Sequence, residues 1–303
     1  MAIVDLFEKT NLGDIVREAR EEAQVDEPRS RLRPASLVAS FSFAFAALLA
    51  GFVVFVFLLS GLAAGRAQSG LERRFAVPLS QGRAQVGGVI AAGTPVARLD
   101  IPGIGLHQIV VEGTTAAQLQ LGPGHVNITP LPGQVGNAVI AGHRLAYGAP
   151  FSTLSKLRPG AAITVVTGQG HFVYHVTRRY VTSSRDLRPF QATEDNRLTL
   201  ITASNWSATR RLVVVAALSE TAKPFGADRP RVLGRADGGL VGQAGDLSAL
   251  ALWTLILVIV AAASVAMYRR LPRWSSYVAT TPLILLVAWL VYTNLGRVLP
   301  ATL

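Results

Sequence analysis

The chain has 303 residues, half of them hydrophobic, and a formal net charge of +11, so it is long enough for one or two domains and unusually apolar for a soluble protein. It contains no cysteine, which excludes disulfides, zinc–thiolate sites and thiol nucleophiles together. The apolar residues are concentrated in a few long blocks, and these blocks predict membrane-spanning segments.

The N-terminal part predicts a cytoplasmic tail at residues 1–34, followed by a first transmembrane helix at 35–64. The tail is charged, whereas residues 35–64 carry no charge and exceed the roughly 20 apolar residues that cross a bilayer core. A cleaved signal peptide has a shorter apolar region that starts nearer the N-terminus. We therefore interpret residues 35–64 as a retained membrane anchor.

The middle of the chain predicts a β-rich domain between two linkers. Residues 65–92 are rich in Gly, Gln, Ala and Arg and predict a stalk, and residues 221–246 predict a second linker. Between them, residues 93–220 contain short runs of branched residues separated by Gly, Pro and Asn, which is typical of a barrel or sandwich. The predicted strands are Val96–Ile101, Gln108–Glu112, Ala138–Ala141, Ile163–Val166, Phe172–Val176, Leu198–Thr202 and Leu212–Leu218.

The C-terminal part predicts a hairpin of two further transmembrane helices, at residues 247–268 and 277–296. Arginines precede the first predicted span, and Arg269, Arg270 and Arg273 fill the turn between the second and third. The positive-inside rule assigns both clusters to the cytoplasm. We therefore expect a multi-pass protein of the cell membrane whose N-terminus is cytoplasmic and whose β-rich domain is extracytoplasmic.

The expected location restricts the partners. The domain and its linkers are basic, but nucleic acid is not an extracytoplasmic partner, so acidic lipid headgroups of a bacterial membrane or wall polymers fit this charge better. No cofactor is indicated. The sequence also predicts no metal site, because His171 and His175 share one face of a strand without a third ligand beside them.

Three groups of motifs in the β-rich region carry a more specific signal. They are, in chain order, Ile101–Pro102 with Val110–Gly113, Leu121–His125 and Leu131–Asn137; Val139–Arg144 with Tyr147–Phe151; and Leu198–Ala203 with Arg210–Val214. Together they resemble the sortase family, nearest to the class E type with its Gly-His-Arg-x-x-Tyr-Gly-Ala-Pro-Phe segment. The resemblance covers most of residues 93–220.

The resemblance implies an all-β fold, a closed barrel of about eight strands with its site in a groove on the barrel wall. It also implies a transpeptidase reaction, in which a cysteine thiolate attacks the Thr–Gly bond of a cell-wall sorting signal and the acyl group passes to a cell-wall amine. A histidine acts as acid and base, and an arginine holds the substrate and the oxyanion.

The family's functional residues match positions of this chain with one exception. His143 matches the histidine, and Arg211 matches the arginine, with Arg210 as a second choice for that role. Thr202 matches the residue before the nucleophile, but Ala203 stands where the family has cysteine. The resemblance implies a substrate groove formed by Thr202, Arg144 and Tyr147.

Three interpretations of the missing nucleophile remain open. The first is a degenerate sortase, a pseudoenzyme that binds a sorting-signal peptide, a wall precursor or a membrane protein partner. The second is a divergent transpeptidase or hydrolase that uses Ser204 with His143 and Arg211, although a shift by one residue turns a strand side chain to the opposite face. The third is a deliberate substitution of cysteine by Ala203.

Overall fold

The structure is a computed structural model, and it describes residues 46, 48–205, 207–224, 247–270 and 273–298. The chain divides into two units, Met1–Leu49 and Ala50–Leu303, and the elements discussed below lie in the second. The predicted tail at 1–34, most of the predicted 221–246 linker and residues 35–45 of the first predicted span fall outside the described residues.

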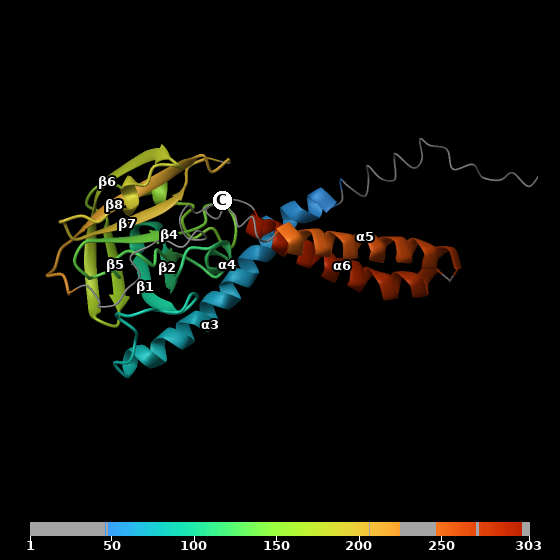
Figure 1. Ribbon diagram of the computed structural model, residues 1–303, viewed down its shortest axis with the longest axis horizontal. Coiled ribbons are helices and arrows are strands. Elements are labelled where there is room, and N and C mark those ends of the chain that lie inside the picture. Colours follow the sequence, from blue (N-terminus) through green and yellow to red (C-terminus); the bar gives the residue numbers. More distant parts are fainter. Residues whose placement is uncertain (1–45, 47, 206, 225–246, 271–272, 299–303) are drawn as a thin grey trace, which may run out of the picture. The chain divides into compact units, whose positions relative to one another are not determined.

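Eight strands close into a barrel in the order β1-β2-β3-β4-β7-β8-β6-β5, so that β5 returns to β1 (Figure 1). The neighbouring strands are antiparallel except for β2–β3 and β4–β7, which run parallel. The predicted closed barrel of about eight strands is therefore confirmed. The strands are β1 Pro95–Ile101, β2 Leu106–Glu112, β3 Gly124–His125, β4 Asn137–Ala141, β5 Ala162–Thr167, β6 Gly170–Ser183, β7 Arg197–Ala203 and β8 Arg210–Leu218.

The barrel interior is filled by side chains from one face of every strand except the two-residue β3. Ile140 of β4, Leu200 of β7 and Val214 of β8 belong to the interior cluster, together with aromatic rings from β6. The intervening residues of β4 and β7 are also buried, because a second cluster covers the outside of this wall. Strands buried on both faces read as continuous apolar runs rather than as alternating ones.

Short helices connect the strands. They are α4 Ala116–Leu119, between β2 and β3, and three 3-10 turns, η3 Pro102–Ile104, η4 Leu154–Lys156 and η5 Arg188–Phe190. Ala116 and Leu119 of α4 pack with Val139, Ala141 and Ile201 on the outside of the β4–β7 wall, and Phe190 of η5 packs against the same group. This outer cluster covers the region where the predicted site residues lie.

The segment predicted as a stalk begins as a helix. A π-helical turn, η2 Phe55–Leu59, is followed by α3 Ser60–Ser80, so that residues 65–80 are helical. Leu71 and Phe75 of α3 pack on Ile109 and Val111 of β2. The Gln68 amide also bonds the peptide N–H of Ile109, at 2.7 Å, and two nearby carbonyls. The polar composition of the segment reflects the solvent-facing side of this helix.

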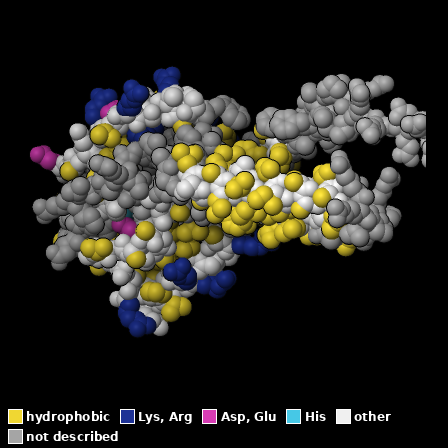
Figure 2. All heavy atoms as spheres, turned by 45° about the vertical axis from the view of Figure 1, so that its right-hand side comes forward, with side chains coloured by type: hydrophobic (Ala, Val, Ile, Leu, Met, Phe, Trp, Pro, Cys, Tyr) yellow, Lys and Arg dark blue, Asp and Glu magenta, His cyan; other side chains and the backbone are white. Residues whose placement is uncertain are grey.

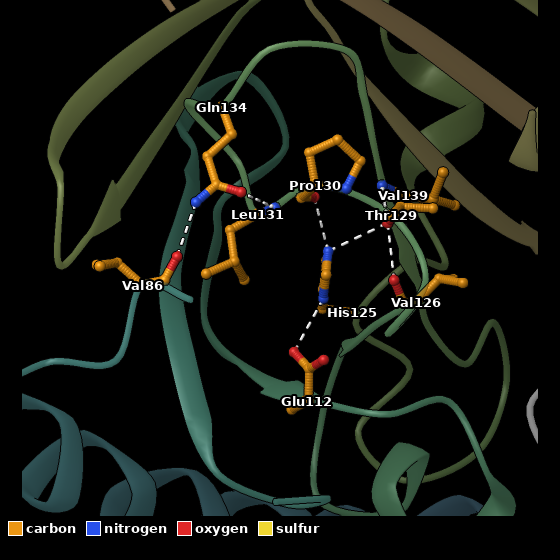
Figure 3. A network of polar contacts seen from close by, with 9 residues as sticks. All are labelled: Val86, Glu112, His125, Val126, Thr129, Pro130, Leu131, Gln134 and Val139. Carbon is orange, nitrogen blue, oxygen red and sulfur yellow. Dashed lines mark hydrogen bonds and ion pairs between the residues drawn. The ribbon is translucent and has the colours of Figure 1, made fainter. Parts of the chain in front are cut away.

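A buried polar network ties β2, β3 and the loop after β3 together (Figure 3). His125 contacts the Glu112 carboxylate through Nδ1, at 2.9 Å, and donates from Nε2 to the Pro130 carbonyl, at 2.8 Å. The Thr129 hydroxyl lies 3.1 Å from the same Nε2. Because both partners are almost completely buried, this pair fixes the approach of β3 to β2 in a low-dielectric environment.

The C-terminal helices α5 Leu247–Arg270 and α6 Arg273–Val298 pack against each other along one apolar seam formed by Leu257, Val287 and Ala288. Figure 2 shows hydrophobic side chains gathered along them on the face in view, and Leu255, Val258 and Leu285 are exposed. Among the described helices, Leu247–Met267 is long and apolar enough to cross a membrane, and the apolar part of α6, Thr280–Gly296, is shorter. Three spans and a multi-pass topology therefore stay predictions.

Candidate functional site

His143 lies just beyond β4, at a position where the backbone comes close to a ring. Gly142 donates its N–H to the Ile201 carbonyl, at 3.1 Å, which extends the β4–β7 ladder by one residue. A Cβ at position 142 would lie 2.8 Å from the Phe151 ring, so only glycine fits in front of His143. Phe151 in turn donates its N–H to the His143 carbonyl, at 3.0 Å. The glycine of the Gly-His-Arg motif is therefore a packing requirement.

The strand register brings three of the predicted site residues level with one another. Ala141 pairs with Ile201 in the parallel β4–β7 ladder, so two residues further on His143 comes level with Ala203. Across the antiparallel β7–β8 ladder, Ala203 pairs directly with Arg211. The alanine therefore occupies the middle of a row whose outer positions hold the histidine and the arginine.

The alternation of side chains assigns this row to the outer face of the barrel wall. Ile201 belongs to the outer cluster and Leu200 to the interior cluster. Residues two apart on a strand share a face, so Ala203 lies on the side of Ile201. On β8 the same rule separates Arg211 from the interior residues Leu212 and Val214.

His143 is a buried, neutral imidazole. Its side chain is 3% exposed, and neither ring nitrogen has a hydrogen-bond partner among the residues that the structure describes. Burial without a compensating charge lowers its pKa to about 4, because desolvation disfavours the imidazolium form. At neutral pH the ring therefore offers one donor nitrogen and one acceptor nitrogen.

Arg211 brings a buried guanidinium to the other end of the row. The residue is 2% exposed, and its guanidinium carbon lies 5.4 Å from the centroid of the Phe190 ring. Burial lowers the pKa of Arg211, while the negative charge of Asp186 opposes this shift. An arginine keeps its charge even so, and stacking on a ring is a common environment for a partly desolvated guanidinium.

Between these two groups the wall offers no nucleophile. Ala203 is 1% exposed and ends β7 with a methyl group. Ser204 continues the ladder, because its N–H donates to the Arg210 carbonyl at 2.8 Å, and alternation then turns its side chain to the side of Thr202, away from that of Ala203. The row of His143, Ala203 and Arg211 therefore lacks a hydroxyl or a thiol.

Two predicted groove residues connect the histidine segment to β7 and the loop after it. The Thr202 hydroxyl donates to the Gly142 carbonyl, at 2.8 Å, and is fully buried. The Arg144 guanidinium donates to the Ser204 carbonyl. Both side chains therefore hold the two halves of the site together.

Tyr147, the third predicted groove residue, lies over the histidine. Its ring centroid is 5.0 Å from that of His143, and the residue is 7% exposed. Its N–H donates to the Ser60 hydroxyl at 3.0 Å, and its own hydroxyl accepts from Gln120 at 3.0 Å. Sequence reasoning missed Ser60 and Gln120, which contact Tyr147, and Phe190, which contacts Arg211. These contacts join distant parts of the chain, and no local sequence motif indicates them.

Comparison with known proteins gives the same family from the sequence. The model of the sortase domain matches residues 99–219. The chain is 30% identical to sortase D of Bacillus subtilis over 88 residues, which cover 29% of this chain and 43% of that protein. It is 27% identical to sortase A of Listeria monocytogenes over 130 residues, which cover 42% of this chain and 58% of that protein. The chain thus spans about half the length of these curated relatives.

Solved structures of sortases are also similar to this chain. Sortase E from Streptomyces avermitilis is 33% identical, with 45% of this chain and 93% of that chain covered and a TM-score of 0.40. The sortase D5 transpeptidase of Clostridium perfringens is 27% identical, with 52% and 98% covered and a TM-score of 0.45. The chain therefore contains a sortase domain, at residues 99–219.

Proposed function

We propose that this chain is a membrane-anchored, extracytoplasmic pseudoenzyme of the sortase family that binds a cell-wall sorting-signal peptide, a wall precursor or a membrane protein partner without transferring it. The observation that carries the proposal is Ala203, which stands between His143 and Arg211 on the outer wall of the barrel. A methyl group has no lone pair, so it forms no acyl-enzyme.

The groups that would recognise a peptide are retained. A neutral imidazole with two unpartnered nitrogens and a buried guanidinium suit a carbonyl or carboxylate of a bound chain. Retaining an imidazole without hydrogen-bond partners among the described residues at a buried position carries a desolvation penalty, and a ligand that bonds it would offset this penalty. This favours a binding site over a purely structural remnant.

The membrane anchor is supported by the long apolar helix Leu247–Met267 and by the uncharged block at 35–64. Sortases are extracytoplasmic and membrane-associated, and they act on cell-wall sorting-signal substrates. An anchor at both ends of the barrel would hold the groove close to the outer leaflet, where a membrane-bound precursor or partner is concentrated.

The test uses the purified full chain in detergent with Leu-x-x-Thr-Gly-type peptides and an amine acceptor. We expect the parent chain to bind the peptide without cleaving it and Ala203→Cys to cleave it, because the substitution restores a nucleophile beside His143 and Arg211. Cleavage by the parent chain that disappears in Ser204→Ala would contradict the proposal and identify a serine enzyme. Absence of peptide binding in every variant would exclude the peptide as the ligand.

A further inference from the structure

The segment that carries His143 continues into a strained turn. Tyr147, Gly148 and Ala149 have positive φ values of 52°, 77° and 46° in succession. Only the middle residue is a glycine, so the two others adopt a left-handed conformation that L side chains disfavour. Such a turn persists only where surrounding contacts hold it.

The contacts that hold this turn come from three helices outside the barrel. Ser60 of α3 accepts the Tyr147 N–H, and Gln120, at the end of α4, donates to the Tyr147 hydroxyl, both at 3.0 Å. Gly296 of α6 faces the same hydroxyl so closely that a Cβ built on it would collide with the oxygen. Gly61 lies beside Gly148, since its Cβ would be 3.7 Å from the Gly148 nitrogen.

The helices that hold the turn also contact each other. Phe55, in the π-helical turn before α3, packs edge-on against Trp289 of α6, with ring centroids 5.0 Å apart. Its ring is also 5.7 Å from that of Tyr292. A shift of α6 relative to α3 would therefore change the positions of Ser60 and Gly296 relative to each other. Both residues lie against Tyr147.

The held turn places Tyr147 over the histidine end of the site. Tyr147 lies against the His143 ring, and His143, Ala203 and Arg211 are all almost completely buried. We propose that Tyr147 is a lid over the row of His143, Ala203 and Arg211, held closed by Ser60, Gln120 and Gly296, so that the helices flanking the barrel control access to the site. The inference rests on the proposed function, because the site that the lid closes is the proposed peptide site.

The test reads access to the site directly and needs no peptide. The chain has no cysteine, so Ala203→Cys places a single thiol beneath the lid. The alkylation rate of this thiol by N-ethylmaleimide, measured by mass spectrometry on the full chain in lipid nanodiscs, reports how often the lid opens. Ser207→Cys, at an exposed position of the β7–β8 loop, gives the rate of an open thiol.

Each lid contact is then removed in the Ala203→Cys background. Ser60→Ala, Gln120→Ala and Tyr147→Phe each delete one of the hydrogen bonds between the turn and the helices. We expect each substitution to raise the alkylation rate about five- to tenfold, the change in an opening equilibrium that one lost bond produces. Gly296→Ala forces Tyr147 to move and should raise the rate as well.

Ser69→Ala is the matched control. The hydroxyls of Ser60 and Ser69 both donate to the carbonyl four residues earlier in the helix, Val56 and Gly65 respectively, but only Ser60 also accepts a bond from the turn. Ser69→Ala should leave the rate unchanged. Tyr147→Phe keeps the ring in place, which guards against a general loss of folding, and circular dichroism checks the fold of each variant.

Two results would overturn the proposal. The first is a thiol at position 203 that already reacts as fast as the one at position 207 in the otherwise unchanged chain. The second is a set of correctly folded variants, Ser60→Ala, Gln120→Ala and Tyr147→Phe, whose rates all equal that of Ser69→Ala. Neither result depends on peptide binding, so a failure of the lid and a failure of the proposed function are distinguishable.

Discussion

In the proposed site, Ala203 stands where the resemblance to sortases implies the nucleophilic cysteine. Ala203 ends its strand in the row between His143 and Arg211, and the next residue with a hydroxyl, Ser204, follows on the other face of the ladder. Successive side chains of a β-strand point to opposite faces. The hydroxyl of Ser204 therefore cannot replace a nucleophile at position 203, which lies between His143 and Arg211. The distinction between the binding and catalytic hypotheses is therefore geometric.

At the same scale, His143 makes the stability of the fold depend on pH. Its folded pKa of about 4 lies below the unfolded value of 6.5, so the unfolded chain takes up a proton first as the pH falls. The contribution of the neutral His143 ring to the unfolding free energy is fully present above pH 6.5. It is lost as the pH falls through the window between 6.5 and 4. From pH 7.5 to pH 5 we expect this residue to remove about 2 kcal/mol of unfolding free energy.

The measurement is urea unfolding of the full chain in a mild detergent at both pH values, compared with His143→Gln, which does not titrate. The parent chain should lose more stability on acidification than the variant. Equal losses in the two proteins would show that the ring of His143 is already solvated in the folded state.

The buried pair of His125 and Glu112 gives a second prediction for single residues. Glu112→Ala leaves His125 without its carboxylate in a dry environment, so we expect a loss of about 3 kcal/mol of unfolding free energy. Glu72→Ala, which removes an exposed carboxylate on α3, should change the stability little. Similar effects of the two substitutions in urea unfolding would contradict a structural role for the pair.

At the scale of elements, hydrophobic runs located the strands well but gave their ends poorly. Strand β6 was predicted as Phe172–Val176 and extends to Ser183, because the polar stretch with Arg178 and Arg179 pairs with β8 after a bulge. Two-residue β3 has no run of its own to reveal it. The closure of the barrel was implied by the family resemblance. The order of the strands, with β4 parallel to β7, was not predicted, since periodicity alone says nothing about which strands are neighbours.

The residues of the candidate site were predictable from the sequence, but the contacts that cover the site were not. His143, Ala203 and Arg211 are each recognisable from their motifs, and the register brings them level. The covering of the site was not predictable, because Tyr147 is held by residues 87 and 27 positions away in the sequence. A contact of this kind depends on how helices pack and leaves no short pattern in the sequence.

The packing of helix α3 on β2 depends on the buried ring of Phe75. Phe75 is 4% exposed against β2, whereas Val77 on the same helix is 56% exposed. Phe75→Ala should lower the unfolding free energy by about 3 kcal/mol, because it removes a buried ring, and Val77→Ala should leave it nearly unchanged. If limited proteolysis between α3 and β1 is equally slow in both variants, the helix does not depend on this contact.

At the scale of the whole molecule, the arrangement of membrane segments is the central prediction. The absence of cysteine allows single thiols to be placed at will. In intact bacterial cells, a membrane-impermeant maleimide should label Ser207→Cys in the barrel. It should label Ser30→Cys, in the tail outside the described residues, only after permeabilisation, because the arginines beside it favour the cytoplasm. Labelling of Ser30→Cys in intact cells would reverse the orientation.

The parallel pairing of β4 with β7 has a consequence for how the barrel forms. Partners such as Val139 and Thr199 are far apart along the chain, and the segment between them contains two strands that pair elsewhere. Contacts of such long sequence separation make folding slow, because a large loop must close before they form. During synthesis, β1 to β6 would be available before β7 and β8 complete the wall that carries the candidate site residues, so the candidate site would be among the last parts of the domain to assemble.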